Sequence, residues 1–235
     1  MSAERWILAV DLGNGGPKVA VVDMEDVLRA VCVRPVSVHI GLDGAATQDA
    51  NEWWVQLLDA AREAITTSGV DPSALHAVAI TGQWGSTVPV DAAGQPVGEV
   101  LLWADTRARD LVREVIGGPV SVSGIAPHKA LPFVRITGGA PSPSGADPTG
   151  HSLLLRERLP EVYARTATLL EPVDYLGLRF TGRAAATPAS MTASWLTDNR
   201  PGAPLGYYAH YDMNRSTPES RARFLQRVST AMASF

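Results

Sequence analysis

The chain has 235 residues, of which 46% are hydrophobic and 19% charged, enough to bury the core of one large domain or one and a half. Its net charge of −4 and scattered basic residues argue against a nucleic-acid or acidic-membrane surface, and its single cysteine, Cys32, excludes an internal disulfide. The apolar runs are too short for a signal peptide or a membrane span, so we expect a soluble cytoplasmic protein.

The stretch Arg5–Asp23, RWILAVDLGNGGPKVAVVD, places two apolar runs on either side of a turn rich in Gly and Asn. This pattern predicts a β-hairpin with Asp11 near its tip. The glycines of the turn keep Cβ atoms away, so that backbone N–H groups could approach a phosphate, and Asp11 could hold Mg²⁺ directly or through its waters. Taken alone, these residues favour the alternative of an ordinary hairpin turn.

Further elements up to residue 81 are predicted in chain order. Val27–Val33 predicts a third strand, so that the N-terminus forms an antiparallel meander feeding a mixed sheet. Gln48–Thr67 predicts an amphipathic helix with Asp49 as its cap. His76–Thr81 predicts a buried strand.

The polar and aromatic residues after this strand are candidates for a binding site. A helix followed by a short apolar strand is the layout of an α/β sheet, in which ligands sit beyond the C-terminal ends of the strands. Gln83 and Trp84 occupy that position. The alternative for Trp84 is a side chain that covers the core at the strand end.

The middle of the chain predicts a small hairpin from Val88–Val90 and Pro96–Val100, and then a strand running into a helix that ends near Ile116. Asp105 and Arg107 lie at that junction. Asp105 is either the N-cap of the helix, with Arg107 solvated, or both side chains point into the space above the sheet.

The last third of the chain begins with Gly138–Gly150, whose Gly, Pro and Ser content predicts a mobile surface loop. Short helices are then expected at His151–Arg158, Val162–Thr166 and Val173–Phe180, with one strand at Thr168–Leu170. A final amphipathic helix is expected at Pro218–Met232. The five histidines show no metal-ligand spacing and are expected at surface or satisfied core positions.

Four stretches, in this order, resemble the N-terminal domain of the FGGY family of carbohydrate kinases, and most closely its xylulokinase-like pentulose kinases. DLGNGGPKV resembles the family's DLGTSxVKV phosphate hairpin, and QDANEWW its QDPxxWW helix entry. TGQWGSTVPVDAAGQPVGEVLLWADTR resembles its GQMHGxVxLDxxGxPLxPAILWNDTR block, and LLEPVDYLGLRFTGR its LLPKDYLRxRLTGE segment. Together they span roughly residues 6 to 183.

The resemblance implies an actin-like, ribonuclease-H-like α/β domain with a mixed sheet flanked by helices. It implies transfer of the ATP γ-phosphoryl group to a sugar hydroxyl, with ATP and Mg²⁺ as cofactors and a small-molecule sugar as partner; a homodimer stays open as an assembly. Asp11 matches the acid that binds Mg²⁺ and phosphate. The implied phosphate-binding residues are Gly13, Asn14, Gly15 and Lys18, and the implied sugar-binding residues are Gln83, Trp84, Gly85, Asp105 and Arg107.

The chain also departs from the family pattern. Ungapped alignment places Ser190 where the family has its catalytic base, and no Asp or Glu lies between Arg183 and Thr197; a serine needs a partner to act as a base. Asn14 replaces the hairpin Thr, and Gly85 replaces a His. Pro17 takes the place of a residue with a strand N–H, so we expect weakened strand pairing at this position.

We therefore expect residues 1–196 to be the family's N-terminal sugar-binding domain, and residues 197–235 to be a C-terminal extension or the start of an absent second domain. Three hypotheses stay open: half of a sugar kinase, a non-catalytic sugar-binding or regulatory module, and an actin-like scaffold without a sugar site.

Overall fold

The computed structural model describes residues 5–198 and 200, which form two compact units. Of the described residues, unit 1 contains 5–38 and 48–83, and unit 2 contains 39–47, 84–198 and 200. No helix of the described residues is both long and apolar enough to cross a membrane.

Unit 1 is built on a four-stranded mixed sheet with the strand order β3-β2-β1-β6. The strands are β1 (Trp6–Gly13), β2 (Gly16–Asp23), β3 (Leu28–Val33) and β6 (Leu75–Gly82). The first three are antiparallel neighbours and β6 runs parallel to β1, which confirms the meander and the mixed sheet predicted from the sequence.

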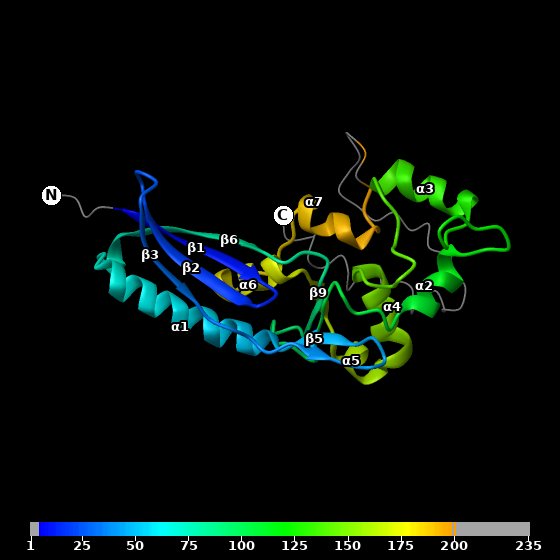
Figure 1. Ribbon diagram of the computed structural model, residues 1–235, viewed down its shortest axis with the longest axis horizontal. Helices are drawn as coiled ribbons and strands as arrows, with labels where there is room; N and C mark the ends of the chain where they lie inside the picture. The colour runs from blue at the N-terminus through cyan, green and yellow to red at the C-terminus, as the bar shows by residue number, and fades with distance from the viewer. Residues whose placement is uncertain (1–4, 199, 201–235) are drawn as a thin grey trace. The chain divides into compact units, whose positions relative to one another are not determined.

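Helix α1 (Ala50–Ser68) packs along strands β2 and β3 (Figure 1). The Asp49 side chain accepts a hydrogen bond from the Asn51 N–H at 2.8 Å, so the predicted cap is confirmed. The helix buries Trp53 and Leu57 on its inner face. After α1, the short helix η1 (Pro72–Ala74) leads into β6.

Pro17 does not disturb the hairpin, contrary to the expectation that it would weaken the local pairing. The β1–β2 ladder continues through it, with Leu12 opposite Pro17 and Gly13 opposite Gly16. Gly13 and Gly16 close the two-residue turn as a hydrogen-bonded pair, so Pro17 falls on the next, non-hydrogen-bonded pair. Its missing N–H therefore removes no bond to β1.

Unit 2 contains two small sheets surrounded by helices. One sheet has the order β4-β5-β8, formed by β4 (His39–Ile40), β5 (Ala46–Gln48) and β8 (Val100–Leu101); in the other, β7 (Val88–Val90) pairs with β9 (Thr168–Leu170). The helices are α2 (Arg109–Ile116), α3 (Pro127–Thr137), α4 (Pro148–Arg158), α5 (Pro160–Arg165), α6 (Pro172–Thr181), α7 (Pro188–Met191) and η2 (Thr192–Ser194).

In unit 2 one local prediction was wrong, one was confirmed in part, and one helix was not predicted. The segment Gly138–Gly150 is not an exposed loop: α4 begins inside it at Pro148, and the buried Asp147 carboxylate accepts hydrogen bonds from the N–H groups of Ser142 and Gly150. The small hairpin predicted from Val88–Val90 and Pro96–Val100 forms in part: Val90 bridges Pro96, and the Val97 N–H donates to the Pro89 carbonyl oxygen at 3.0 Å. Helix α3 was not predicted. The helix predicted at Pro218–Met232 lies outside the described residues.

Candidate functional site

The predicted site residues are divided between the two units. Unit 1 holds Asp11, Gly13, Asn14, Gly15, Lys18 and Gln83, and unit 2 holds Trp84, Gly85, Asp105, Arg107 and Ser190. The first group lies at the β1–β2 turn and at the end of β6.

The turn between β1 and β2 leaves room for a ligand on one side only. A Cβ built on Gly15 meets no atom within 4 Å, whereas one built on Gly16, where φ is +123°, would lie 2.1 Å from the carbonyl oxygen of Arg34. Glycine is therefore required at position 16, because a side chain there would collide with the backbone of Arg34. Gly15 faces open space, where its backbone is accessible to a phosphate.

Asp11 and Lys18 face each other across the hairpin ladder, and the Lys18 ammonium lies 3.1 Å from Asp11 Oδ2. Both side chains are about half exposed, so the ion pair stabilises the hairpin by less than about 1 kcal/mol. The two charges are therefore free to separate and bind a ligand.

Gln48 connects the turn to the end of β6. Its side-chain amide donates to the Asn14 carbonyl oxygen at 2.8 Å, and its Oε1 accepts from the Gln83 amide at 3.1 Å. The Trp53 indole N–H also donates to Gln48 Oε1, at 3.2 Å. Because Gln48 is completely buried, this network fixes Asn14 and Gln83 relative to each other.

An exposed carboxylate beside accessible backbone fits the magnesium ion that the resemblance implies. Mg²⁺ in phosphoryl-transfer sites is commonly held by one or two carboxylates and by the substrate phosphates. Among the residues that the structure describes, no group of three or more His, Cys, Asp or Glu could hold a metal ion, so Asp11 would act with phosphate oxygens and water.

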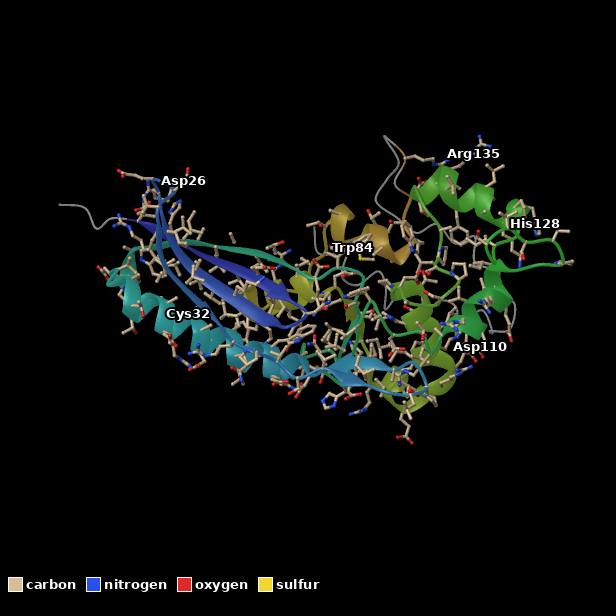
Figure 2. The ribbon with its side chains drawn as sticks, viewed as in Figure 1. Asp26, Cys32, Trp84, Asp110, His128 and Arg135 are labelled. Atoms are coloured by element: carbon tan, nitrogen blue, oxygen red, sulfur yellow. The ribbon has the colours of Figure 1, made fainter. Side chains whose placement is uncertain are left out.

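In unit 2, two tryptophans are exposed beside Gly85. The Trp84 and Trp103 side chains are 52% and 49% exposed, which is unusual for the largest apolar side chain (Figure 2 labels Trp84). A Cβ built on Gly85, where φ is +80°, would lie 3.6 Å from the Trp103 Cβ. The Trp103 N–H donates to the buried Ser86 hydroxyl at 3.1 Å, which fixes this segment next to the strand that follows Gly85.

Asp105 is fully buried and orients Arg107. Its carboxylate accepts from the Ala46 N–H at 3.1 Å and from the Arg107 guanidinium, with Nη2 at 2.7 Å. The side chain of Asp105 does not cap helix α2, whose N-cap is Ala108 without a side-chain hydrogen bond. The hydrogen bond that Arg107 donates to Asp105 raises the pKa of Arg107, so the guanidinium is held charged and in a defined position.

Ser190 is buried at the start of α7 and belongs to a capping box with Thr187. Its hydroxyl accepts from the Thr187 N–H at 3.0 Å and has two acceptors within reach, the Thr187 carbonyl at 3.0 Å and Asp174 Oδ1 at 3.1 Å. The hydrogen-bonding capacity of this hydroxyl is therefore used within the protein.

Two buried carboxyls lie beneath this region of unit 2. Glu171 accepts a hydrogen bond from the Gly85 N–H at 2.9 Å, and burial raises its pKa well above the ordinary value. Burial raises the pKa of Asp174 to about 7, although the Ser190 hydroxyl partly opposes that shift. Glu171 and Ser190 also line a cavity of about 20 Å³, roughly the space of one water molecule.

Sequence reasoning did not identify Gln48, Trp103, Glu171 or Asp174 as residues that support the site. A signal existed for Glu171, because an acid directly before Pro172 at the start of α6 is a typical helix-start pattern. For Gln48 no local signal marked its role, since two of its partners, Asn14 and Gln83, come from distant segments.

Comparison with protein families gives one match: the model of the FGGY family of carbohydrate kinases, N-terminal domain, matches residues 6–132. Among curated relatives, glycerol kinase of Deinococcus radiodurans is 32% identical over 108 residues, covering 46% of this chain and 22% of that protein. Glycerol kinase of Bordetella pertussis is 30% identical over 117 residues, covering 49% of this chain and 23% of that protein.

Solved structures of such kinases share the fold. A xylulose kinase from Brucella ovis superposes with a TM-score of 0.71 at 21% identity, over 82% of this chain and 38% of that one. Plasmodium falciparum glycerol kinase with ADP superposes with a TM-score of 0.73 at 17% identity, over 97% of this chain and 42% of that one. The actin-like α/β fold is thereby confirmed, and the chain spans less than half the length of the proteins it matches.

Proposed function

Because the chain belongs to the FGGY family of carbohydrate kinases, we propose that it binds a small sugar or polyol in unit 2 and the phosphates of MgATP at the hairpin of unit 1, as the N-terminal half of a phosphotransferase. In this proposal residues 1–196 are the family's N-terminal domain in a soluble, cytoplasmic enzyme. The observation that carries the sugar site is the exposure of Trp84 and Trp103, which lie close in sequence to Gly85 and to the oriented Asp105–Arg107 pair, respectively.

Two exposed indole rings and a fixed guanidinium suit a sugar. Indole rings pack against the apolar C–H face of a polyol, while guanidinium N–H groups donate to its hydroxyls. Asp105 is buried and saturated with hydrogen bonds, so its part is to hold Arg107 and not to contact the sugar. A pentulose is the proposed substrate, since the quoted motifs are closest to xylulokinase-like members; glycerol is the first alternative to compare.

At the hairpin, Asp11 would hold the magnesium ion, the backbone at Gly15 would lie against phosphate oxygens, and Lys18 would neutralise phosphate charge. MgATP supplies the phosphoryl group and a cation that neutralises its charge. Gln48 keeps Asn14 and Gln83 fixed while the exposed Asp11–Lys18 pair separates to bind the ligand.

A second candidate function is a non-catalytic sugar-binding or regulatory module. The hydroxyl of Ser190, the position of the expected base, is buried and already hydrogen-bonded to Thr187 and in reach of Asp174. A kinase reaction would therefore need a proton acceptor outside the segment from Arg183 to Thr197. Under this second function the sugar still binds, but no phosphoryl group is transferred.

Sugar binding and sugar-dependent ADP formation separate these candidates. We expect the 235-residue chain to bind a pentulose or glycerol in isothermal titration, with Trp84→Ala weakening the affinity at least about tenfold because an aromatic contact is removed. Trp54→Ala is unsuitable as a control because Trp54 lies on α1, so Arg135→Gln in unit 2 serves instead. ADP formation that requires the sugar supports the kinase; binding without ADP formation supports the module.

A further inference from the structure

Unit 2 contains a second hollow, a cleft of about 580 Å³ between α2 and α4. Its charged lining consists of Arg107, Arg109, Arg113 and Arg158 together with Asp43 and Asp110. Arg107 is the one lining residue that also belongs to the candidate sugar site; neither exposed tryptophan lines the cleft. Figure 2 labels Asp110 on α2 and Trp84, which lie well apart within unit 2.

The lining is positive although the whole chain carries a net charge of −4. Four guanidinium groups face two carboxylates, and Asp110 is already paired with Arg158. Among the described residues, Arg109 and Arg113 have no carboxylate partner; they are four residues apart on α2 and so lie on one face of the helix. Two like charges in this arrangement repel each other, and an anion between them would relieve that repulsion.

Two of the arginines are held in place. Arg158 Nη1 donates to the Arg107 carbonyl at 2.9 Å, and its other nitrogen contacts Asp110. Arg107 is held by the buried Asp105. A cleft with two fixed and two free guanidinium groups can form several charge-assisted hydrogen bonds to one anion at a small cost in side-chain ordering.

We propose that this cleft binds the phosphate group of a small phosphomonoester, with Arg109, Arg113 and Arg158 as its ligands. Planar guanidinium groups match phosphate oxygens in pairs, and the volume is that of a small-molecule site. The remaining described lining consists of Thr106 and the aliphatic Leu154 and Leu159, with no aromatic ring on which a nucleobase could stack. The ligand is therefore a phosphorylated polyol or sugar and not a nucleotide.

The test measures binding of inorganic phosphate and of glycerol phosphate to the full chain by isothermal titration, in chloride buffer at constant ionic strength. We expect both to bind and the Arg109→Gln/Arg113→Gln double variant to weaken both affinities at least about tenfold, since hydrogen bonds to a charged group are lost. Arg158→Gln, on a different helix, weakens them as well. Arg135→Gln removes an exposed arginine of α3 and leaves them unchanged.

Lys18→Gln distinguishes the cleft from the hairpin of unit 1. The proposal would be overturned by loss of phosphate binding in Lys18→Gln, or by an unchanged phosphate affinity in the Arg109→Gln/Arg113→Gln variant. Tighter binding of AMP than of glycerol phosphate would also overturn it. The proposal does not depend on the kinase function: a chain that binds no sugar, but binds phosphate through Arg109 and Arg113, refutes the proposed function and leaves the cleft assignment intact.

Discussion

Asp23 in unit 1 and Asp174 in unit 2 are both buried, yet their surroundings move their pKa values in opposite directions. Asp23 accepts hydrogen bonds from the N–H groups of Glu25 and Val27 and from the Arg29 guanidinium, and these donors lower its pKa. Asp174 accepts a hydrogen bond from the Ser190 hydroxyl, but burial has the larger effect and raises its pKa to about 7. Donors close in sequence explain the first case, and burial by distant segments explains the second.

The same difference holds for the two units as wholes. Unit 1 is a hairpin meander with one amphipathic helix, and Asp23 is the one buried carboxyl among its described residues. Unit 2 buries Asp105, Asp147, His151, Glu171 and Asp174. Burial lowers the pKa of His151 to about 4 and raises that of Asp147 to about 6. The proposed sugar and anion sites both lie in this more polar unit.

The largest effect is expected from breaking the turn of unit 1. Gly16→Ala would place a Cβ 2.1 Å from the Arg34 carbonyl oxygen in a backbone conformation that suits glycine. We expect a loss of about 3 kcal/mol or more in the free energy of unfolding, measured by urea denaturation. Gly15→Ala is the matched control, because its Cβ meets no atom, and should change stability by less than about 1 kcal/mol. Equal losses in both variants would contradict the turn geometry.

The pH dependence of stability should differ in sign between Asp174 and Asp23. A carboxyl whose folded pKa is raised binds more protons in the folded than in the unfolded state, so its contribution to stability falls as pH rises towards 7. Asp174→Asn, neutral at every pH, should therefore gain roughly 2 kcal/mol relative to the native chain between pH 5 and pH 8.

Asp23→Asn is the opposite case. Its lowered folded pKa gives stability that is present above the unfolded pKa and is lost as pH falls through the folded value. The variant should therefore be destabilised at neutral pH and approach the native chain in acid. Denaturant titrations of both variants across pH 3–8 measure the two slopes, and slopes of the same sign would contradict the contrast between the units.

A smaller effect tests the local character of unit 1. Asp49→Ala removes the side-chain cap of α1 and should cost about 1 kcal/mol in the free energy of unfolding. Asp49→Asn or Asp49→Ser keeps an acceptor and should recover most of that loss. Thermal unfolding followed by circular dichroism measures this loss of stability. A loss near zero for Asp49→Ala would mean that packing alone stabilises helix α1.

Local sequence patterns predicted the elements of unit 1 well, although the strand at His76–Thr81, predicted to be buried, has no buried residue in β6. Alternation gave strands β1, β2 and β3, and the Asp49 cap and apolar periodicity gave α1 within two residues of its bounds. The effect of Pro17 on strand pairing was predicted wrongly because it depends on whether Pro17 falls on a hydrogen-bonded or a non-hydrogen-bonded pair of the ladder. Which kind of pair it is depends on where the turn closes.

Unit 2 was predicted less well because its polar residues are defined by contacts over long sequence distances. Asp105 could be a cap or a ligand by pattern alone; its bond to Ala46, 59 residues away, makes it an anchor for Arg107. The segment Gly138–Gly150 looked like a loop by composition, but the buried Asp147 ties it down. The roles proposed for Asp11, Gln83, Trp84 and Ser190 stay predictions.

The most direct test of the central claim is isothermal titration of the 235-residue chain with a panel of pentuloses, hexuloses, gluconate and glycerol, together with its Trp84→Ala and Arg107→Gln variants. We predict that at least one of these ligands binds to the native chain and that both variants weaken it. Absence of binding for every member of the panel, or unchanged affinity in both variants, would contradict a sugar site in unit 2.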